Sequence, residues 1–278
     1  MISRAIFTIL AVASVAYGTS QAPRPGTENS YIIHGASLET VTSAVLAVNG
    51  EITHELGIID AVGAQLSQVQ LDALRTQGGI IKVFADGPVK AAVAPVGENI
   101  ADTDGGGNGN SGRPSYYGAL IGADMLHDQG VSGSGVAIAV LDSGVWKHAD
   151  LLEDADGRTR LVGGYDAIAG KTLRTKNTKD QFGHGSHVAS VAVSSALAPS
   201  GSFNGIAPRA DLVSVVAFGA DGTGSYADVI RGIDWVVAKK DHYNIRVLNL
   251  SFSAPPRSHY WDDPLNQAVM AAWQAGIV

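Results

Sequence analysis

The sequence of 278 residues contains no cysteine, so it can form neither a disulfide framework nor a thiolate metal site. It also lacks an excess of basic residues, and its net charge of −7 argues against nucleic-acid binding. After the first residues, no segment is long and apolar enough to cross a bilayer. Hydrophobic residues still make up 45% of the chain, which allows a substantial core in one large and one small domain.

Residues 1–18 have the layout of a secretory signal peptide. Arg4 precedes a mostly apolar run, and Ala16 and Gly18 place small residues at the two positions that a signal peptidase reads. The alternative is a buried N-terminal helix, but the Pro/Gly-rich stretch over residues 19–29 favours export. We therefore expect a secreted protein, extracellular or periplasmic, with no membrane contact after signal removal.

Residues 30–90 are expected to form a small α+β unit of the ferredoxin-like type, with the element order β-α-β-β-α-β. Such a unit could be a binding module by itself. Residues 91–115 lose periodicity and are rich in Gly, Asn and Asp, which predicts a flexible linker open to proteolysis or a long loop without a processing role. Within the small unit we expect strands at 31–33, within 51–66 and at 80–84, and helices at 38–48 and 69–77.

Residues 116–278 alternate between strand and helix patterns. Continuous apolar runs predict strands covered on both faces, and Ser225 and Asp228 have the spacing of a capping box before an apolar helical stripe. The alternation predicts an α/β fold with a doubly wound, mostly parallel sheet, whose ligands bind at the carboxyl ends of the strands. The strands are expected at 136–141, 212–218 and 247–252, and the helices around 229–237 and from 264 to 275.

Asp142 and His184 are the two residues of this region that suggest acid–base chemistry. Asp142 directly follows the first buried run, where this architecture keeps its active sites. His184 opens an apolar helix between two glycines, which let the backbone and a substrate approach the ring closely. An acid at a strand end and a histidine at a helix start can form the acid–base half of a Ser-His-Asp system.

Each segment also has a plainer interpretation. Asp142 could belong to an ordinary strand-ending turn, and the histidines could cap a helix without chemistry. His184 and His187 could share a metal ion with His148 or Asp150, but the zincin pattern needs histidines four apart with a glutamate beside the first. On the residues alone these alternatives stay open.

Taken together, the segments resemble the subtilisin-like serine proteases. The resemblance covers nearly everything after residue 18, and residues 30–90 look like the propeptide of that family, an intramolecular chaperone and inhibitor. Residues 140–151 (Val-Leu-Asp-Ser-Gly-Val to His-Ala-Asp-Leu) resemble the aspartate motif, and residues 183–189 (Gly-His-Gly-Ser-His-Val-Ala) resemble the histidine motif, with serine where threonine is usual. The next landmarks match at residues 205–208, 218–224 and 248–253.

The resemblance implies a secreted serine endopeptidase that is made as a zymogen and acts on polypeptides as a monomer. By position, Asp142 and His184 would be members of the catalytic triad. Asp180 would lie near the substrate, either selecting a basic residue or as a solvated loop acid. Two backbone edges would hold an extended substrate strand: Gly222, Thr223 and Gly224 on one side, and Ser251, Phe252 and Ser253 on the other.

Three departures from the family pattern matter: at Ser253, at the calcium site and at the nucleophile. Ser253 stands where glycine is usual beside the primary specificity pocket, which predicts a preference for small or medium residues there. Asp150 matches a calcium ligand of the family, but the helix insertion that completes that site is not recognisable in residues 194–204, so structural calcium stays open and the chemistry requires no cofactor. Residues 154–157 look calcium-like but are expected to form an acidic turn.

The third departure concerns the nucleophile. The Gly-Thr-Ser-Met-Ala serine motif and the oxyanion asparagine of the family do not occur up to Val278. We therefore expect the serine to lie beyond this chain and residues 1–278 alone to be inactive. The alternative is a non-catalytic pseudoprotease or inhibitor-like module that ends at Val278.

Overall fold

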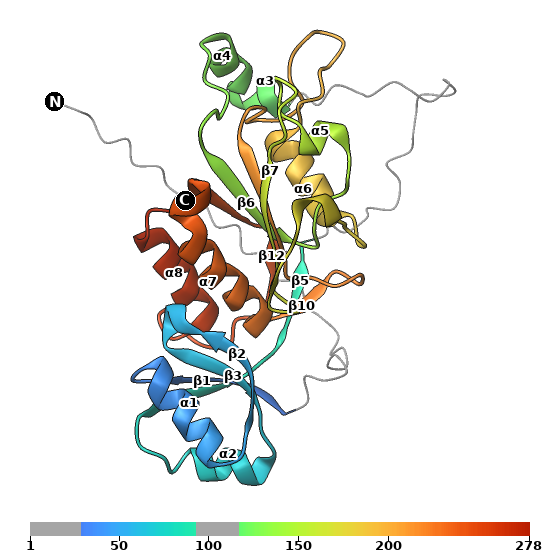
Figure 1. The fold of residues 1–278 in the computed structure, drawn as a ribbon. Coiled ribbons are helices and arrows are strands. Elements are labelled where there is room, and N and C mark those ends of the chain that lie inside the picture. Colours follow the sequence, from blue (N-terminus) through green and yellow to red (C-terminus); the bar gives the residue numbers. More distant parts are fainter. Residues whose placement is uncertain (1–28, 93–116) are drawn as a thin grey trace, which may run out of the picture.

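The computed structural model describes residues 29–92 and 117–278. The predicted signal peptide and almost all of the predicted linker lie outside these residues. The described part contains a small N-terminal unit and a larger α/β unit, and a short three-stranded sheet contains strands from both (Figure 1). No helix of the described part is long and apolar enough to span a membrane.

The N-terminal unit is a four-stranded antiparallel sheet with two helices on one face. Its strand order, β2-β3-β1-β4, is that of the ferredoxin-like arrangement. Val41, Leu71 and Leu74 of the helices are buried against Ile33 of the sheet in a core of their own. The elements are β1 (Ser30–Gly35), α1 (Leu38–Ala47), β2 (Glu51–Leu56), η1 (Gly57–Ile59), β3 (Ala61–Gln65), α2 (Gln68–Leu74) and β4 (Ile80–Ala85).

The larger unit is built on a five-stranded sheet of order β11-β6-β9-β7-β8. The first four strands are parallel and only β8 runs antiparallel, so the expected mostly parallel α/β sheet is confirmed. The strands are β6 (Ala137–Asp142), β7 (Leu161–Asp166), β8 (Lys171–Thr172), β9 (Asp211–Val216) and β11 (Ile245–Leu250).

Helices cover both faces of this sheet because successive strand residues point to opposite sides. Val140 of β6 packs in the cluster of α6 (His184–Val193), whereas the next residue, Leu141, packs in the cluster of α7 (Tyr226–Tyr243) and α8 (Pro264–Gln274) (Figure 1). The predicted capping box of α7 is present, and an aspartate caps α8 in front of its first-turn proline. The shorter helices are α3 (Tyr117–Ile121), α4 (Ala123–Asp128) and α5 (Ala149–Leu152).

The third sheet contains strands from both units. Strand β5 (Pro88–Ala91) leaves the N-terminal unit and lies antiparallel between β10 (Thr223–Ser225) and β12 (Phe252–Ser253). The strand therefore crosses residue 90, where the small unit is predicted to end. Figure 1 shows β5 running from the N-terminal unit towards the carboxyl ends of the parallel strands.

Candidate active site

Asp142 and His184 lie in direct contact. Asp142 is the last residue of β6, and His184 is the first residue of α6, so both stand at the carboxyl edge of the parallel sheet. Nδ1 of His184 lies 2.9 Å from Oδ1 and 2.8 Å from Oδ2 of Asp142. Because a carboxylate can only accept, Nδ1–H donates, which leaves Nε2 for proton transfer.

The carboxylate of Asp142 is completely buried and held by its own neighbour. The main-chain N–H of Ser143 donates to Oδ1 at 2.7 Å, and the Ser143 hydroxyl donates to the same oxygen at 3.2 Å. Burial raises the pKa of Asp142 above its ordinary value, and the hydrogen bonds from His184 and Ser143 offset only part of that rise. The site thus holds a desolvated carboxylate against the Nδ1 edge of the imidazole.

Glycines make this contact possible. A Cβ on Gly185 would lie 2.3 Å from the carbonyl oxygen of Gly144 and 3.1 Å from Cβ of Asp142. Gly144 itself has φ of 120°, and a Cβ there would lie 2.1 Å from the carbonyl oxygen of Lys179. The Gly-His-Gly and Asp-Ser-Gly patterns are therefore requirements for close approach between β6 and α6.

The structure contradicts both roles that the sequence suggested for Asp180, a selector of basic residues and a solvated loop acid. It is 7% exposed, and its oxygens accept from the N–H groups of Phe182, Gly183 and Ser186 and from the Ser186 hydroxyl at 2.7–3.1 Å. Burial alone would raise the pKa of Asp180, but these donors outweigh it and hold the pKa below its ordinary value. A carboxylate so occupied is neither a solvated loop acid nor a selector of basic residues; it holds the first turn of α6.

An extended segment of the chain itself lies beside His184. The N–H of Ala91 donates to the carbonyl oxygen of Gly222 at 2.9 Å, and the N–H of Ala92 donates to that of Ser251 at 3.0 Å. The carbonyl oxygen of Ala92 lies 3.1 Å from Nε2 of His184. A peptide carbonyl at that distance stands where an acid–base group could serve a reaction at the same peptide unit.

The six predicted substrate-binding residues line both sides of this strand. In β10, Thr223 pairs with Lys90 and Gly224 pairs with Val89. In β12, Phe252 pairs with Ala91 and Ser253 pairs with Lys90, while Gly222 and Ser251 accept the two bonds described above. The structure therefore brings Gly222, Thr223, Gly224, Ser251, Phe252 and Ser253 together around one extended segment.

In the described residues, His184, His187, His148 and Asp150 do not form a metal-binding group. His148 Nδ1 lies 3.6 Å from Asp150 Oδ2, but within residues 29–92 and 117–278 no group of three His, Cys, Asp or Glu side chains could hold a metal ion. The calcium-like turn is closed by arginines: Arg158 donates to Asp154 at 2.9 Å, and Arg209 to Asp156 at 3.0 Å. The acidic-turn interpretation thus matches the contacts of this segment.

Two contributors to the site were missed in the sequence. Ser143 links Asp142 to α6, because its hydroxyl oxygen also accepts from the N–H of Gly185 at 3.0 Å. The second is the segment that ends at Ala92, since its pairing partners lie more than a hundred residues away. The Asp-Ser-Gly motif was a signal for the first; nothing local signalled the second.

Comparison with protein families agrees with the motifs. Residues 133–278 match the model described as the subtilase family. The chain is 35% identical over 159 residues to the serine protease AprX of Bacillus subtilis, an overlap that spans 55% of this chain and 34% of that protein. It is 30% identical over 228 residues to an alkaline protease of Alkalihalobacillus alcalophilus, which spans 82% of this chain and 50% of that protein.

A solved structure has the same fold. The crystal structure of fervidolysin from Fervidobacterium pennivorans superposes with a TM-score of 0.63 at 23% identity and covers 92% of this chain and 40% of its own. The match includes the N-terminal unit as well as the parallel sheet. In these comparisons the chain spans no more than about half the length of its relatives, 34% and 50% for the two proteases above.

Proposed function

Because this chain belongs to the subtilase family, we propose that the protein is a serine endopeptidase with Asp142 and His184 as the acid–base half of its triad. The observation that carries the proposal is the bonding of His184: Nδ1 faces the buried carboxylate of Asp142, and Nε2 faces the peptide carbonyl of Ala92. The imidazole therefore connects the acid to a peptide unit held in extended conformation.

The chemistry assigned to these residues is acyl transfer. His184 takes the proton of a serine hydroxyl as that oxygen attacks the peptide carbonyl carbon, and returns it to the amine nitrogen as the C–N bond breaks. Water then takes the place of the amine and attacks the acyl-enzyme ester. The same two proton transfers through His184 release the carboxylic-acid product and restore the serine. Asp142 orients the ring and stabilises the imidazolium that forms.

The nucleophile is assigned to sequence outside the described residues. Among residues 29–92 and 117–278, no serine hydroxyl hydrogen-bonds to Nε2 of His184. The family match does not favour the non-catalytic alternative. A fluorophosphonate probe distinguishes the two: the product of the complete coding sequence should be labelled at one serine, and residues 1–278 alone should not be labelled.

We further propose that polypeptides bind as β5 does, as a strand between β10 and β12. The two edges bind main-chain groups, which every sequence offers, and this suits an endopeptidase. Side chains of the strand alternate: Val89 and Ala91 are buried, whereas Lys90 is exposed. Selection along β5 would therefore operate at the positions of Val89 and Ala91. The preference expected from Ser253 applies separately at the position of Ala92, whose side chain is small.

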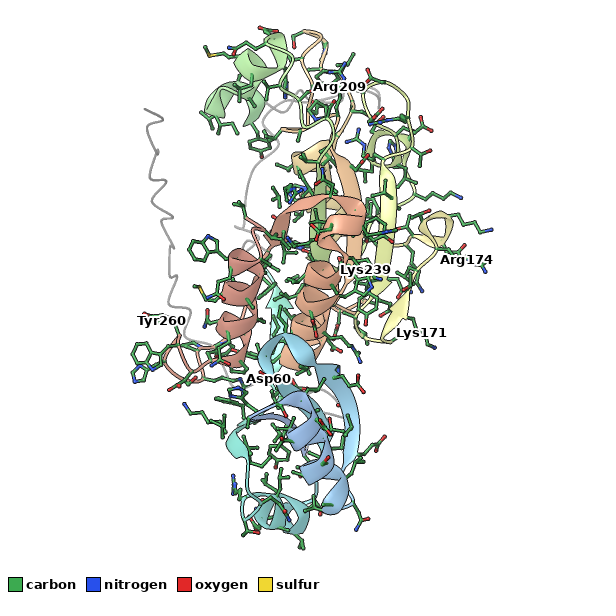
Figure 2. All side chains as sticks on the ribbon, turned by 60° about the vertical axis from the view of Figure 1, so that its left-hand side comes forward. Asp60, Lys171, Arg174, Arg209, Lys239 and Tyr260 are labelled. Carbon is green, nitrogen blue, oxygen red and sulfur yellow. The ribbon has the colours of Figure 1, made fainter. Side chains whose placement is uncertain are left out.

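The N-terminal unit is proposed to be a propeptide that folds with the catalytic unit and inhibits it. Polar contacts support a specific docked pose: Nε2 of His54 lies 3.1 Å from Asp228, and Arg231 donates to the carbonyl oxygen of Thr53 at 3.2 Å. Lys82 of β4 forms an ion pair with Asp262, in the loop that presents Tyr260 at the molecular edge in Figure 2. Apolar contacts support it too, because Leu56 and Ile59 share a buried cluster with α7 and α8.

Export is also part of the proposal, on the strength of the signal-peptide pattern in residues 1–18. Fusion of these residues to a reporter should send it out of the cytoplasm, and replacement of the apolar run should retain it.

Peptide-bond hydrolysis is tested on the complete gene product with casein as substrate. His184→Ala should lower kcat on the order of 10⁶-fold, the size of loss that the equivalent change causes in subtilisin, and Asp142→Ala on the order of 10⁴-fold. The exposed His148→Ala serves as the matched control and should keep wild-type activity. Undiminished casein cleavage by purified His184→Ala would rule the assignment out.

A further inference from the structure

Arg160, the residue before β7, is a cation with 0% exposure. Its guanidinium donates only to main-chain carbonyl oxygens: Nε to Glu153 at 2.9 Å, Nη2 to Pro208 at 2.9 Å, and Nη1 to Val193. In the described part of the chain no carboxylate forms an ion pair with Arg160. One side chain thus ties together the end of α5, the last turn of α6 and the loop before β9.

A buried charge without a carboxylate partner is costly unless dipoles replace its hydration. Here the dipoles are carbonyl groups, and that of Val193 belongs to the negative end of helix α6. Burial lowers the pKa of Arg160 to about 10, against the opposing effect of the nearby carboxylates of Asp154, Asp211 and Asp150. The guanidinium therefore remains charged at neutral pH and is coordinated by oxygen atoms, as a metal cation would be.

Asp150, which resembles a calcium ligand of the family, lies in the same corner of the fold. The oxygen atoms there do not provide a calcium site. Ca²⁺ takes about six to eight oxygen ligands. The main-chain oxygen of Asp150 already accepts from the N–H of Ser195 at 3.0 Å, and its carboxylate lies 3.6 Å from His148. In the part that the structure describes, no group of three His, Cys, Asp or Glu side chains is placed so that it could hold a metal ion.

The segment after α6 is closed by its own backbone. The N–H of Gly205 donates to Ser194 O at 3.1 Å, and Asn204 N–H donates to Ala196 O at 2.9 Å. The carbonyl oxygens of Ser194 and Ala196 therefore already accept from main-chain amides, and the buried cation of this corner is Arg160. This corner lies near Arg209 in Figure 2, at the end of the molecule away from the N-terminal unit.

We propose that Arg160 is a built-in structural cation: its guanidinium occupies a carbonyl-lined site and does for α5, α6 and the loop before β9 what a bound metal ion does in other proteins. Because α6 carries His184 on its first turn and Val193 on its last, Arg160 also holds the catalytic helix in place. When the side chain is removed, the oxygens that remain form a binding site for a free guanidinium ion.

The experiment measures thermal unfolding of Arg160→Ala in millimolar guanidinium chloride, far below denaturing concentrations. The Tm of the variant should fall well below that of the wild type, and guanidinium should raise it again in a saturable way. Sodium chloride at the same ionic strength should not. The absence of a saturable rise, or an equal rise with sodium chloride, would overturn the proposal.

Arg158→Ala is the matched control, because this arginine stands two positions away, has a 61% exposed side chain and pairs with Asp154. Its Tm should not respond to guanidinium, and a response equal to that of Arg160→Ala would count against a specific site. Should Arg160→Ala fail to fold, Arg160→Lys and Arg160→Met replace it. The lysine variant should unfold at a higher temperature than the methionine variant; a methionine variant as stable as the lysine variant would show that no cation is needed.

Discussion

Asp142 and Asp180 are both buried carboxylates of the site, but their pKa values move in opposite directions. Burial dominates at Asp142 and raises its pKa, while hydrogen bonds dominate at Asp180 and lower it. A carboxylate with a raised pKa costs stability once it ionises, whereas one with a lowered pKa contributes stability as the anion. The ionised form of Asp142 thus lowers the free energy of unfolding, whereas the ionised form of Asp180 raises it by holding the first turn of α6.

The first prediction concerns Asp180→Asn. Because the folded-state pKa of Asp180 is lowered below the ordinary 3.8, its contribution is complete above that pH and is lost as the pH falls through the folded value. The variant should lose about 2 kcal/mol of unfolding free energy at pH 7, since the bonds go to a charged acceptor. Urea unfolding from pH 7 to pH 3 should show the gap closing at low pH. A gap independent of pH would refute the role, and the exposed Asp241→Asn should show none.

The second prediction concerns Ser253→Gly. Ser253 pairs with Lys90, so its side chain stands at the edge that binds the main chain just before Ala92. Removing the side chain should widen the acceptance of large aromatic residues at the position of Ala92. Profiling a peptide library with both forms of the complete enzyme measures this. An unchanged profile would remove Ser253 from the account of specificity.

At this scale the sequence was sufficient to predict that Asp142 and His184 lie together, because short motifs encode them with the glycines that permit their contact. It was insufficient for Asp180. The four donors that bury this carboxylate come from a loop and a helix turn whose closure depends on tertiary structure. A polar residue in a polar segment therefore looked solvated.

Among the elements, β5 contributes most to the proposed function and was least visible in the sequence. It has four residues, begins with proline and shows no long apolar alternation. Its partners β10 and β12 are shorter still and lie far away in the sequence. Strands of this kind form only when tertiary structure aligns them, so sequence patterns placed a boundary where the structure has a strand.

The third prediction tests β5 as an inhibitory strand. Residues 29–92, added in trans, should inhibit the mature enzyme, and Val89→Asp in that polypeptide should weaken inhibition at least about tenfold. Val89 is completely buried, so a carboxylate there would be desolvated. Lys90→Ser changes the exposed neighbour and should have a smaller effect. Equal inhibition constants for the wild type and Val89→Asp would show that β5 does not bind in the cleft.

The fourth prediction compares two buried serines on neighbouring elements. The hydroxyl of Ser214 in β9 has no hydrogen-bond partner, so Ser214→Ala should be neutral or stabilising by up to about 1 kcal/mol. Ser225 caps α7, so Ser225→Ala should cost about 1 kcal/mol. Urea unfolding of both variants provides the comparison. Destabilisation of Ser214→Ala as large as that of Ser225→Ala would mean that the Ser214 hydroxyl is satisfied.

For the molecule as a whole, the sequence sufficed for the doubly wound, mostly parallel fold class and for strands β6, β9 and β11, but β7 and β8 were not predicted. Continuous apolar strands between capped helices leave few other solutions. The docking of the N-terminal unit on α7 and α8 could not be inferred in detail. It depends on polar pairs such as His54 with Asp228, whose members lie 174 residues apart and look like ordinary surface residues.

This docking also explains how one chain can hold both the cleft and the strand that fills it. One face of the ferredoxin-like sheet packs on its own helices, and the other packs on α7 and α8 of the larger unit. This packing fixes the position from which β5 extends towards His184. The carbonyl oxygen of Ala92 lies 3.1 Å from Nε2 of that histidine. We propose that the protein cleaves its own chain after Ala92.

The most direct test is the N-terminal sequence of the mature protein, obtained from the complete gene product purified away from other proteases. We predict a new N-terminus at Val93, from cleavage after Ala92, and no processing in His184→Ala. Cleavage within the segment up to Tyr116 but away from Ala92 would show that β5 is not held as a substrate. Processing of His184→Ala at the wild-type rate would contradict the account as a whole.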